Sequence, residues 1–247
     1  MAPTPQPSLS ALTIHNVKPA FARWLLLASA AFAGSVQAIT ISPVLIELSP
    51  AQRVVSVTIS NPSDQAMSLQ VETLSWSQPD GTNYYQPTED LLVAPPIAEI
   101  PPQGSQIFRV TLRHPLSGSV EQTYRLVLED ISEVLNPKSG VVAIRFRHNL
   151  PVYVTPPGEA KAAARWSRCA AAAGKGCVRL DNDGSRRLRV SELTVAGQGW
   201  QQKVPGGAVL AGAWKQFNFD LASGLSPLDS ITAKTEQGDI SATLSVP

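Results

Sequence analysis

One stretch of the sequence, residues 141–155, constrains the fold more than any other. Apolar and polar residues alternate in it over about fourteen positions, and only His148 interrupts the apolar row. This period of two is the pattern of a β-strand. A common strand has about five or six residues, so this one outruns an ordinary sheet and leaves apolar groups available to another chain. Because native proteins usually suppress such an edge, we expect this one to have a use.

The first 38 residues have the organisation of a removable secretory signal. Lys18 and Arg23 precede an apolar run from Trp24 to Ala33, and Val36-Gln37-Ala38 gives a small-x-small cleavage pattern. A membrane anchor is the alternative, but the run falls short of the roughly 20 residues that span a bilayer. We therefore expect cleavage after Ala38, export to the periplasm, and no membrane insertion of the mature chain.

The charge balance of the remaining chain argues against two classes of partner. Of the 20 basic residues only two precede residue 39, and all 19 acidic residues follow it. A chain so near neutrality lacks the basic patch by which proteins bind nucleic acid or anionic membranes. Its length suits two domains of about 100 residues each.

The two cysteines, Cys169 and Cys177, lie eight residues apart. In an exported chain, such a pair predicts a disulfide that closes a hairpin-like loop. A redox-active pair is the alternative, but its usual C-x-x-C spacing is absent.

Residues 39–156 contain seven strand-like segments separated by turn signals. Seven short strands in about 115 residues predict a β-sandwich of immunoglobulin type. The segments are 39–48, which Pro43 interrupts, 53–60, 68–76, 91–94, 106–113, 123–131 and the long strand at 141–155.

A second set of strands is expected after Pro156-Pro157, in residues 157–247, so the fold class is all-β with two sandwiches. Its Ala-rich beginning, 160–173, favours a helix by propensity, whereas Arg165, Trp166 and the expected disulfide favour a strand. The expected strands are 163–168, 177–181, 186–196, 208–220, 228–234 and 240–246.

The sequence does not assemble an enzyme site. His114 and His148 are the only histidines after residue 38, and neither has a Glu or Cys partner at metal-ligand spacing. Nucleophile-elbow, phosphate-loop and dinucleotide-binding patterns are absent. We therefore predict neither catalysis, nor a metal site, nor a cofactor, and we interpret His148 as a packed core or interface residue.

Four arginines remain as candidates for recognition, each on the side of its strand opposite the main apolar row. They form either a solvated sheet face or a cluster that holds a carboxylate through charge-assisted hydrogen bonds. They are Arg109, Arg125, Arg145 and Arg147.

Taken in order, several segments resemble the periplasmic chaperones of chaperone–usher pilus assembly. The resemblance covers essentially all of 39–247. It rests on Val93-Ala94-Pro95-Pro96, Pro102-Gln103-Gly104-Ser105-Gln106 followed by Arg109, residues 121–131, the long strand ending in Pro156-Pro157, and Val178–Asn182 leading into Leu188–Val195.

This resemblance implies two immunoglobulin-like domains set at an angle, in a boomerang shape, with a cleft between them. It also implies that the seventh strand is lent to a pilus subunit that lacks its own last strand, a form of donor-strand complementation. By position, Val142, Ile144 and Phe146 would be the donated side chains. The implied partners are pilus subunits and an outer-membrane usher, and a second copy of the chain is a further candidate to cover the strand.

The chain departs from the better-studied branch of that family at the anchor for the subunit's C-terminal carboxylate. The matching positions fall near Leu45 and near Asn149 or Pro151, and none of these is basic. We expect Arg125, Arg145 and Arg147, in that order, to replace them. In this departure the chain resembles the archaic branch of the family, whose subunits are often called spore-coat-U-like. A pilus subunit, or a secreted two-domain adhesin or binding module, is the alternative function.

Overall fold

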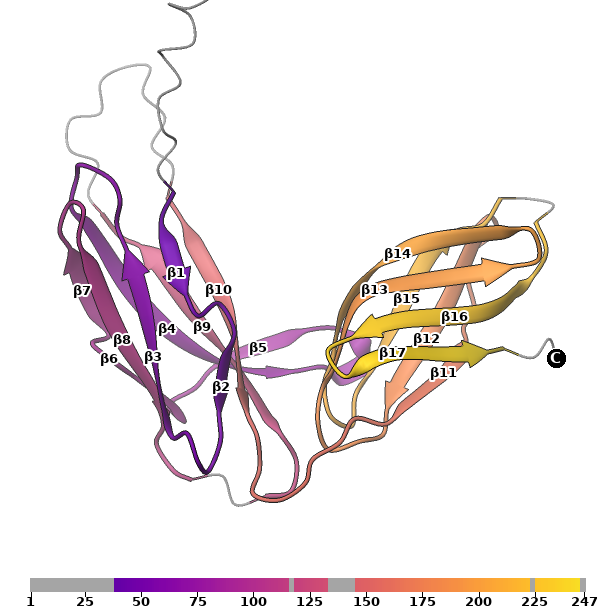
Figure 1. Ribbon diagram of the computed structural model, residues 1–247, viewed down its shortest axis with the longest axis horizontal. Coiled ribbons are helices and arrows are strands. Elements are labelled where there is room, and N and C mark those ends of the chain that lie inside the picture. The colour runs from indigo at the N-terminus through magenta and orange to yellow at the C-terminus, as the bar shows by residue number, and fades with distance from the viewer. Residues whose placement is uncertain (1–37, 116–117, 133–144, 223–224, 245–247) are drawn as a thin grey trace, which may run out of the picture. The chain divides into compact units, whose positions relative to one another are not determined.

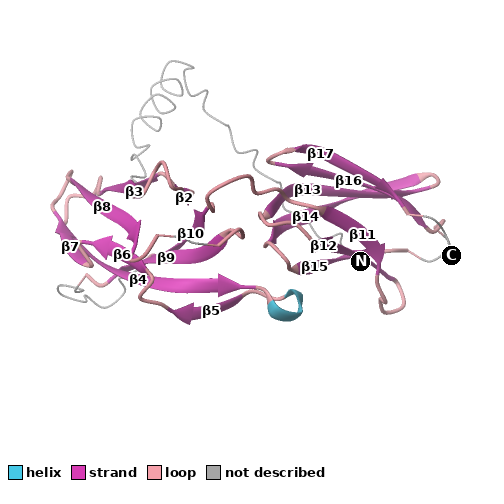
Figure 2. Cartoon of the chain, turned by 90° about the horizontal axis from the view of Figure 1, so that it is seen from below, coloured by secondary structure: helices cyan, strands magenta, loops and turns pink. Residues whose placement is uncertain are grey.

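Alternating apolar residues form two pairs of sheets, each pair enclosing its own core (Figure 1). The structure is a computed structural model that describes residues 38–115, 118–132, 145–222 and 225–244. Within these ranges the chain forms strands and one short 3-10 helix, Pro79–Gly81 (Figure 2). None of the described helices could cross a bilayer. The expected signal lies outside the described residues, apart from Ala38.

The first sandwich consists of a four-stranded and a six-stranded sheet. The four-stranded sheet has the order β1 (Thr40–Ser42), β3 (Val54–Ser60), β8 (Ser105–Leu112) and β6 (Leu91–Ala94). The other has the order β2 (Ile46–Leu48), β10 (Arg147–Val154), β9 (Gln122–Asp130), β4 (Met67–Ser77) and β5 (Tyr84–Pro87), with β7 (Ile97–Ile100) also paired to β4.

The inward residues of these strands form one core. In β3 the buried residues are Val55, Val57 and Ile59, every second position. β9 contributes Leu126 and Leu128 to the same core, while its Val127 is buried on the opposite face. This is the alternation expected when one face of a sheet is packed and the other is open. The expected β-sandwich is confirmed.

Pro43 divides the first predicted strand between the two sheets. β1 pairs with β3 in one sheet, whereas β2 pairs with β10 in the other. A proline has no N–H for the ladder, so pairing must lapse where it stands. β2 covers only the last three residues of β10.

The second sandwich contains a three-stranded and a four-stranded sheet. Their orders are β11 (Ala164–Arg168), β12 (Lys175–Asn182), β15 (Trp214–Asp220), and β14 (Trp200–Val209), β13 (Leu188–Gly197), β16 (Leu228–Thr235), β17 (Gly238–Thr243). The Ala-rich segment forms strand β11 rather than a helix. The predicted domain boundary after residue 156 stays a prediction, although the strands of the two sandwiches fall on either side of it.

One predicted strand in this region, 208–220, is wrong as a single element. β14 ends at Val209 and β15 begins at Trp214. Between them Gly212 has a φ of 68°, a left-handed conformation that glycine adopts without steric cost. The turn therefore separates two strands that belong to different sheets.

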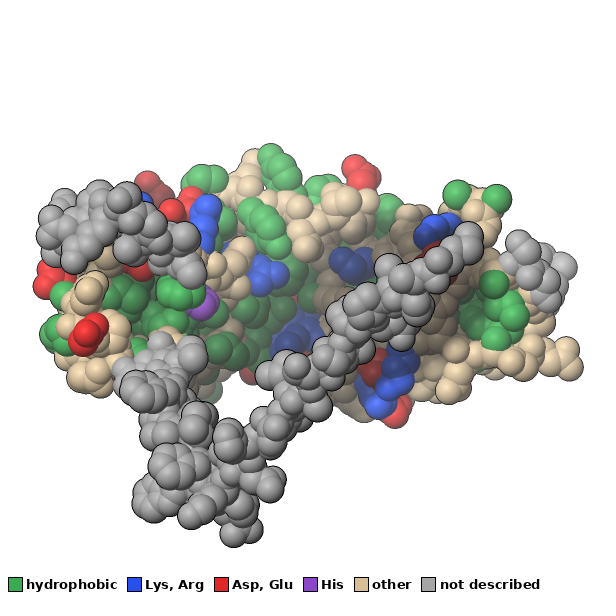
Figure 3. Space-filling model, turned by 90° about the horizontal axis from the view of Figure 1, so that it is seen from above, with side chains coloured by type: hydrophobic (Ala, Val, Ile, Leu, Met, Phe, Trp, Pro, Cys, Tyr) green, Lys and Arg blue, Asp and Glu red, His purple; other side chains and the backbone are tan. Residues whose placement is uncertain are grey.

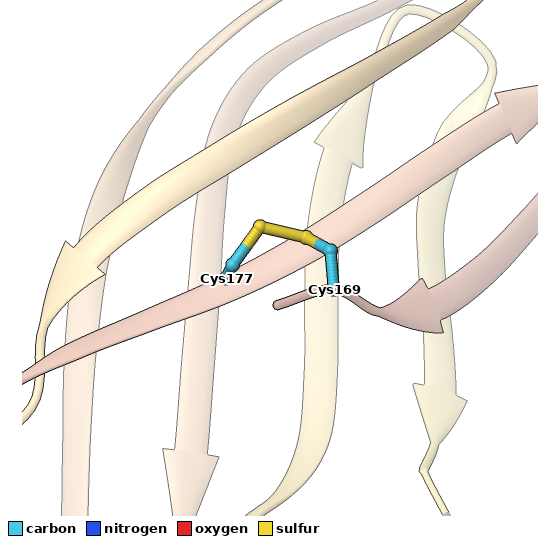
Figure 4. Close-up of a disulfide and its surroundings, with 2 residues drawn as sticks. All are labelled: Cys169 and Cys177. Atoms are coloured by element: carbon cyan, nitrogen blue, oxygen red, sulfur yellow. A yellow bond between two sulfur atoms is a disulfide. The ribbon is translucent and has the colours of Figure 1, made fainter. Parts of the chain in front are cut away.

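The predicted disulfide between Cys169 and Cys177 is formed (Figure 4). It links the segment after β11 to β12, and the Cys169 N–H donates to the Cys177 carbonyl at 3.2 Å. Closing so short a loop stabilises the fold by roughly 2–3 kcal/mol in the chain-entropy picture.

A buried asparagine closes a corner in each sandwich. Asn61 follows β3 and Asn182 ends β12, and both are at most 3 % exposed. Each donates its side-chain amide to the carbonyl four residues later and to a carbonyl far along the chain. These acceptors are Gln65 (2.7 Å) and Ile100 (3.2 Å) for Asn61, and Arg186 (2.8 Å) and Val209 (3.2 Å) for Asn182.

Candidate functional site

The inward row of β10 passes from the core to the surface along the strand. Leu150, Val152 and Val154 are buried in the first core. His148 is half-buried, and Phe146, just before the strand, is 48 % exposed. The Phe146 and His148 rings stack with centroids 6.0 Å apart. This stacking supports the prediction that His148 is a packed residue.

The other two predicted donor residues, Val142 and Ile144, lie outside the described residues. Phe146 is the described member of the set. Figure 3 shows hydrophobic side chains (green) exposed on the surface of the first sandwich.

One edge of β10 is paired along its whole length and the other is not. β9 pairs with β10 from Arg147 to Val154, whereas β2 pairs only with Val152–Val154. From residue 145 to residue 150, the second edge has no strand partner among the described residues.

Two hydrogen bonds establish which backbone groups face that free edge. The Asp130 N–H donates to the Phe146 carbonyl at 2.9 Å, so even-numbered residues of β10 direct their backbone groups to β9. The Thr155 N–H donates to the Leu48 carbonyl at 2.9 Å, so odd-numbered residues direct theirs to the opposite edge. The backbones of Arg147 and Asn149 therefore face the free edge, and that of Pro151 lies on the same side, where the pairing with β2 begins.

Arg125 stands on the outer face of the same sheet, directly across from Pro151 on β10 and Leu74 on β4. Its guanidinium carbon lies 3.8 Å from the ring centroid of Trp76 and 5.6 Å from that of Tyr85. The buried Nε has no hydrogen-bond partner among the described residues. Arg125 thus keeps donor capacity while its plane rests on an aromatic ring, which is an arrangement suited to receiving an anion.

The other predicted anchors do not converge with Arg125. Arg147 pairs with Glu72 at 2.9 Å and with Glu129 at 3.8 Å. Arg145 donates to the Ser132 carbonyl at 3.2 Å. Arg147 stands four residues from the partner of Arg125, or about 13 Å along the strand.

The remaining arginine of the set, Arg109, belongs to β8 in the opposite sheet. The four arginines therefore do not form one cluster. Arg145 and Arg147 already bind neighbouring groups of the chain. The assignment of the carboxylate anchor stays a prediction.

A buried arginine that sequence reasoning missed lies at the other end of β10. Arg187 is 1 % exposed and contacts Glu121, which is fully buried, at 2.5 Å. It also pairs with Glu47 and lies over the ring of Tyr153, with 3.6 Å from its guanidinium carbon to the centroid. Burial raises the pKa of Glu121, and the attraction of Arg187 opposes that rise. No local signal predicts these contacts, because the arginine and its carboxylate are 66 residues apart.

The outer face around Tyr153 is covered by residues of the second sandwich. Trp76, Tyr153 and Leu210 form one buried cluster. The side-chain amide of Gln78 donates to the Ala208 carbonyl and accepts from the Leu210 N–H, both at 2.9 Å. Residues 38–247 form one compact unit, so these contacts close the base of β10 and leave its beginning open.

The described residues also contain no group of three metal-ligating side chains. The site therefore combines a backbone edge of β10 that has no strand partner among the described residues, the exposed ring of Phe146 just before the strand, and Arg125 on the neighbouring strand β9.

Comparison with known sequences identifies one family. Residues 38–160 match the sequence model of a family described as pili and flagellar-assembly chaperone, PapD N-terminal domain. A search of curated proteins found no match.

Solved structures share the fold at low sequence identity. A chain of the CsuC–CsuE chaperone–tip adhesion subunit pre-assembly complex, from archaic chaperone–usher Csu pili of Acinetobacter baumannii, is 19 % identical with a TM-score of 0.67. The alignment covers 85 % of the present chain and 100 % of that one. A chain from the complex of the Salmonella enterica SafA pilin with the SafB chaperone is 14 % identical with a TM-score of 0.63, covering 86 % and 99 %. The Pseudomonas aeruginosa CupB2 chaperone is 16 % identical with a TM-score of 0.58, covering 83 % and 100 %.

Proposed function

Because the chain belongs, through residues 38–160, to the pili and flagellar-assembly chaperone family, we propose that it is a periplasmic chaperone that captures pilus subunits and delivers them to an outer-membrane usher. It captures them by lending residues 142–146, which precede β10, together with the beginning of β10. The role is one of binding rather than of chemistry. The observation that carries the proposal is the free edge of β10 together with the exposed ring of Phe146. Two of the similar structures are described as complexes of a chaperone with a pilin or a tip subunit.

The energy of capture comes mainly from apolar burial in this proposal. Val142, Ile144 and Phe146 enter the groove of the subunit, and each buried side chain contributes roughly 1.5–3 kcal/mol. Backbone hydrogen bonds along the free edge add direction, because a one-residue slip would turn every donated side chain to the wrong face.

The anchor for the subunit's carboxylate is Arg125 in this proposal, ahead of Arg145 and Arg147. Arg125 has a buried donor without a partner, whereas Arg147 is already paired with Glu72. In the present structure the guanidinium leans over Trp76, on the β4 side of β9. Reaching a chain at the free edge of β10 therefore requires a change of rotamer. The bond would contribute about 1.5–3 kcal/mol.

Co-expression with a small exported subunit encoded beside this chain tests strand donation. We expect Phe146→Asp to abolish co-purification, because a carboxylate cannot be buried unpaired in the subunit's core. Ile107→Asp is the matched control, since Ile107 is similarly exposed at 42 % but lies on the opposite sheet. Normal co-purification with the Phe146 variant, while it remains folded, would mean that this segment is not donated.

Substitution of Arg125 tests the proposed carboxylate anchor separately from the burial of the donated apolar side chains. Arg125→Ala should weaken subunit binding by about 10- to 150-fold, measured by titration of the purified pair. Arg109→Ala serves as the control, because that exposed arginine stands on β8. An unchanged dissociation constant for Arg125→Ala would reject the anchor while leaving strand donation standing.

A further inference from the structure

Among the described residues of the inward row of β10, His148 is the one polar side chain. It stands between Phe146, which is half exposed, and Leu150, which is buried in the first core. Across the strand pair it lies opposite Leu128 of β9, another residue of that core. An imidazole therefore occupies a position whose neighbours along the row and across the strand pair are apolar.

The imidazole of His148 carries an unpaired nitrogen. Its Nε2 atom is buried and has no hydrogen-bond partner among the described residues. Leaving a buried polar atom unpaired is costly, whereas an apolar group of similar shape is close to neutral or stabilising. A leucine, as at position 150, would therefore serve the free protein better. The histidine is better explained by a bound state than by the stability of the free chain.

The position of His148 along the strand places it beside a captured subunit. The ring of Phe146 stacks on the imidazole, with centroids 6.0 Å apart and planes 18° from parallel. In the proposed function Phe146 leaves this stack and enters the subunit, which uncovers the imidazole. β2 does not reach this part of the row, because it pairs only with Val152–Val154. A side chain of the subunit can then contact His148.

We propose that His148 selects among subunits through a hydrogen bond between its Nε2 atom and a hydroxyl group of the subunit. The inference rests on the proposed function and adds a polar requirement to a site otherwise built for apolar burial. A neutral imidazole carries a proton on one nitrogen only, so Nε2 either donates or accepts. The hydroxyl of serine, threonine or tyrosine can do both and satisfies either form. The preferred subunit therefore carries such a residue at the end of its groove nearest the first core.

A packed aromatic ring is the alternative role for His148, and the two roles predict different results. If only packing matters, an aliphatic replacement lowers the stability of the free protein and its affinity for a subunit together. If the hydrogen bond matters, the same replacement raises the stability and lowers the affinity.

His148→Leu separates the two roles. We expect the midpoint of thermal unfolding of the free protein to rise by about 2–4 °C, because the unpaired nitrogen is removed. We expect the dissociation constant for a subunit encoded beside this chain to rise at least about fivefold, because the hydroxyl of the subunit is left buried without its partner. His114→Leu is the matched control and should change neither quantity, since His114 is exposed and lies beyond the end of β8.

Two amide variants test whether the bond is made at Nε2. The amide of glutamine reaches about as far from the backbone as Nε2 of histidine, whereas that of asparagine ends nearer the place of Nδ1. His148→Gln should therefore bind the subunit within about threefold of the wild-type protein. His148→Asn should bind as weakly as His148→Leu.

Substitutions in the subunit identify the hydroxyl. Serine is changed to alanine, threonine to valine and tyrosine to phenylalanine, one at a time, along the groove. One of these changes should weaken binding to the wild-type protein at least about fivefold. The same change should have no further effect on binding to His148→Leu.

Each contrary result has a definite meaning. Unchanged or tighter binding by His148→Leu would overturn the hydrogen bond, as would equal binding by the two amide variants. Lower stability combined with weaker binding of His148→Leu would also overturn it and would assign the ring to packing. Failure of the wild-type protein to bind the subunit, or normal binding by Phe146→Asp, would instead overturn the proposed function.

Discussion

The two halves of β10 share one alternating pattern but differ in what surrounds them. Leu150–Val154, the buried half, has its inward side chains in the first core, and the paired edge of β2 along its last three residues. Residues 145–149, here called the exposed half, comprise the two residues before β10 and its first three residues. Their second edge has no strand partner among the described residues, and the ring of Phe146 is half exposed. The comparison shows that the same period of two can serve a protein's own core at one end and be left for another chain at the other. The length of the neighbouring strand β2 decides which residues of this row are covered by the protein itself.

Loss of Arg187 is expected to have the largest effect, because it removes the cover of the buried half. Arg187→Ala leaves the fully buried Glu121 with only Arg186, 3.9 Å away, as a counter-charge. We expect a loss of about 3–5 kcal/mol in the free energy of unfolding, measured by urea denaturation. The double variant Arg187→Met with Glu121→Gln is the control and should lose much less. Equal losses for both would mean that shape, rather than charge, holds this contact.

Truncation within the row separates its two halves directly. Leu150→Ala should cost about 2–5 kcal/mol of stability, since it opens a cavity in the core. Phe146→Ala should change the stability by no more than about 0.5 kcal/mol and still weaken subunit binding. The comparison between the halves fails if the two variants lose stability equally.

Titration of Tyr124 gives the smallest effect. Tyr124 pairs with Val152 in the buried half, and burial, aided by the charge of Asp90, raises the pKa of its hydroxyl to about 12. Because the pKa of Tyr124 is raised in the folded state, its neutral hydroxyl contributes to the free energy of unfolding. That contribution is complete below about pH 10 and is lost as the pH rises through about 12.

The absorbance of ionised tyrosine near this pH measures that transition, and Tyr124→Phe should remove its last step. An unchanged alkaline titration in the variant would show that Tyr124 is not enclosed as described.

Much of the fold could be predicted because its signals are local. Alternation predicts β3, β8 and β9 closely, and Pro43 predicts an interruption. β5 and β7 were missed, since Tyr84–Pro87 and Ile97–Ile100 are short and lie among prolines. Most of β14 was missed as well, since Trp200–Val209 contains Pro205, Gly206 and Gly207. The division of 208–220 was missed because one glycine conformation, at Gly212, decides it.

The candidate site was less accessible to sequence reasoning. The free edge follows from how short β2 is, and that depends on pairing rather than on composition. The burial of Arg187 depends on Glu121 and Glu47, both distant in sequence, and an arginine is by default a surface residue. The sequence favoured Arg125 over Arg145 and Arg147 but did not show their partners. In the structure Glu72 and Glu129 pair with Arg147, whereas Arg125 has no acidic partner among the described residues.

The paired asparagines have a consequence for both sandwiches. Asn61 and Asn182 make the same two kinds of bond, each to one carbonyl near in the chain and one far from it. Replacing either asparagine by leucine, a side chain of similar size without a donor, would leave those carbonyls without this partner. Each sandwich therefore depends on one amide group to hold a crossing of its chain that no strand pairing holds within the described ranges.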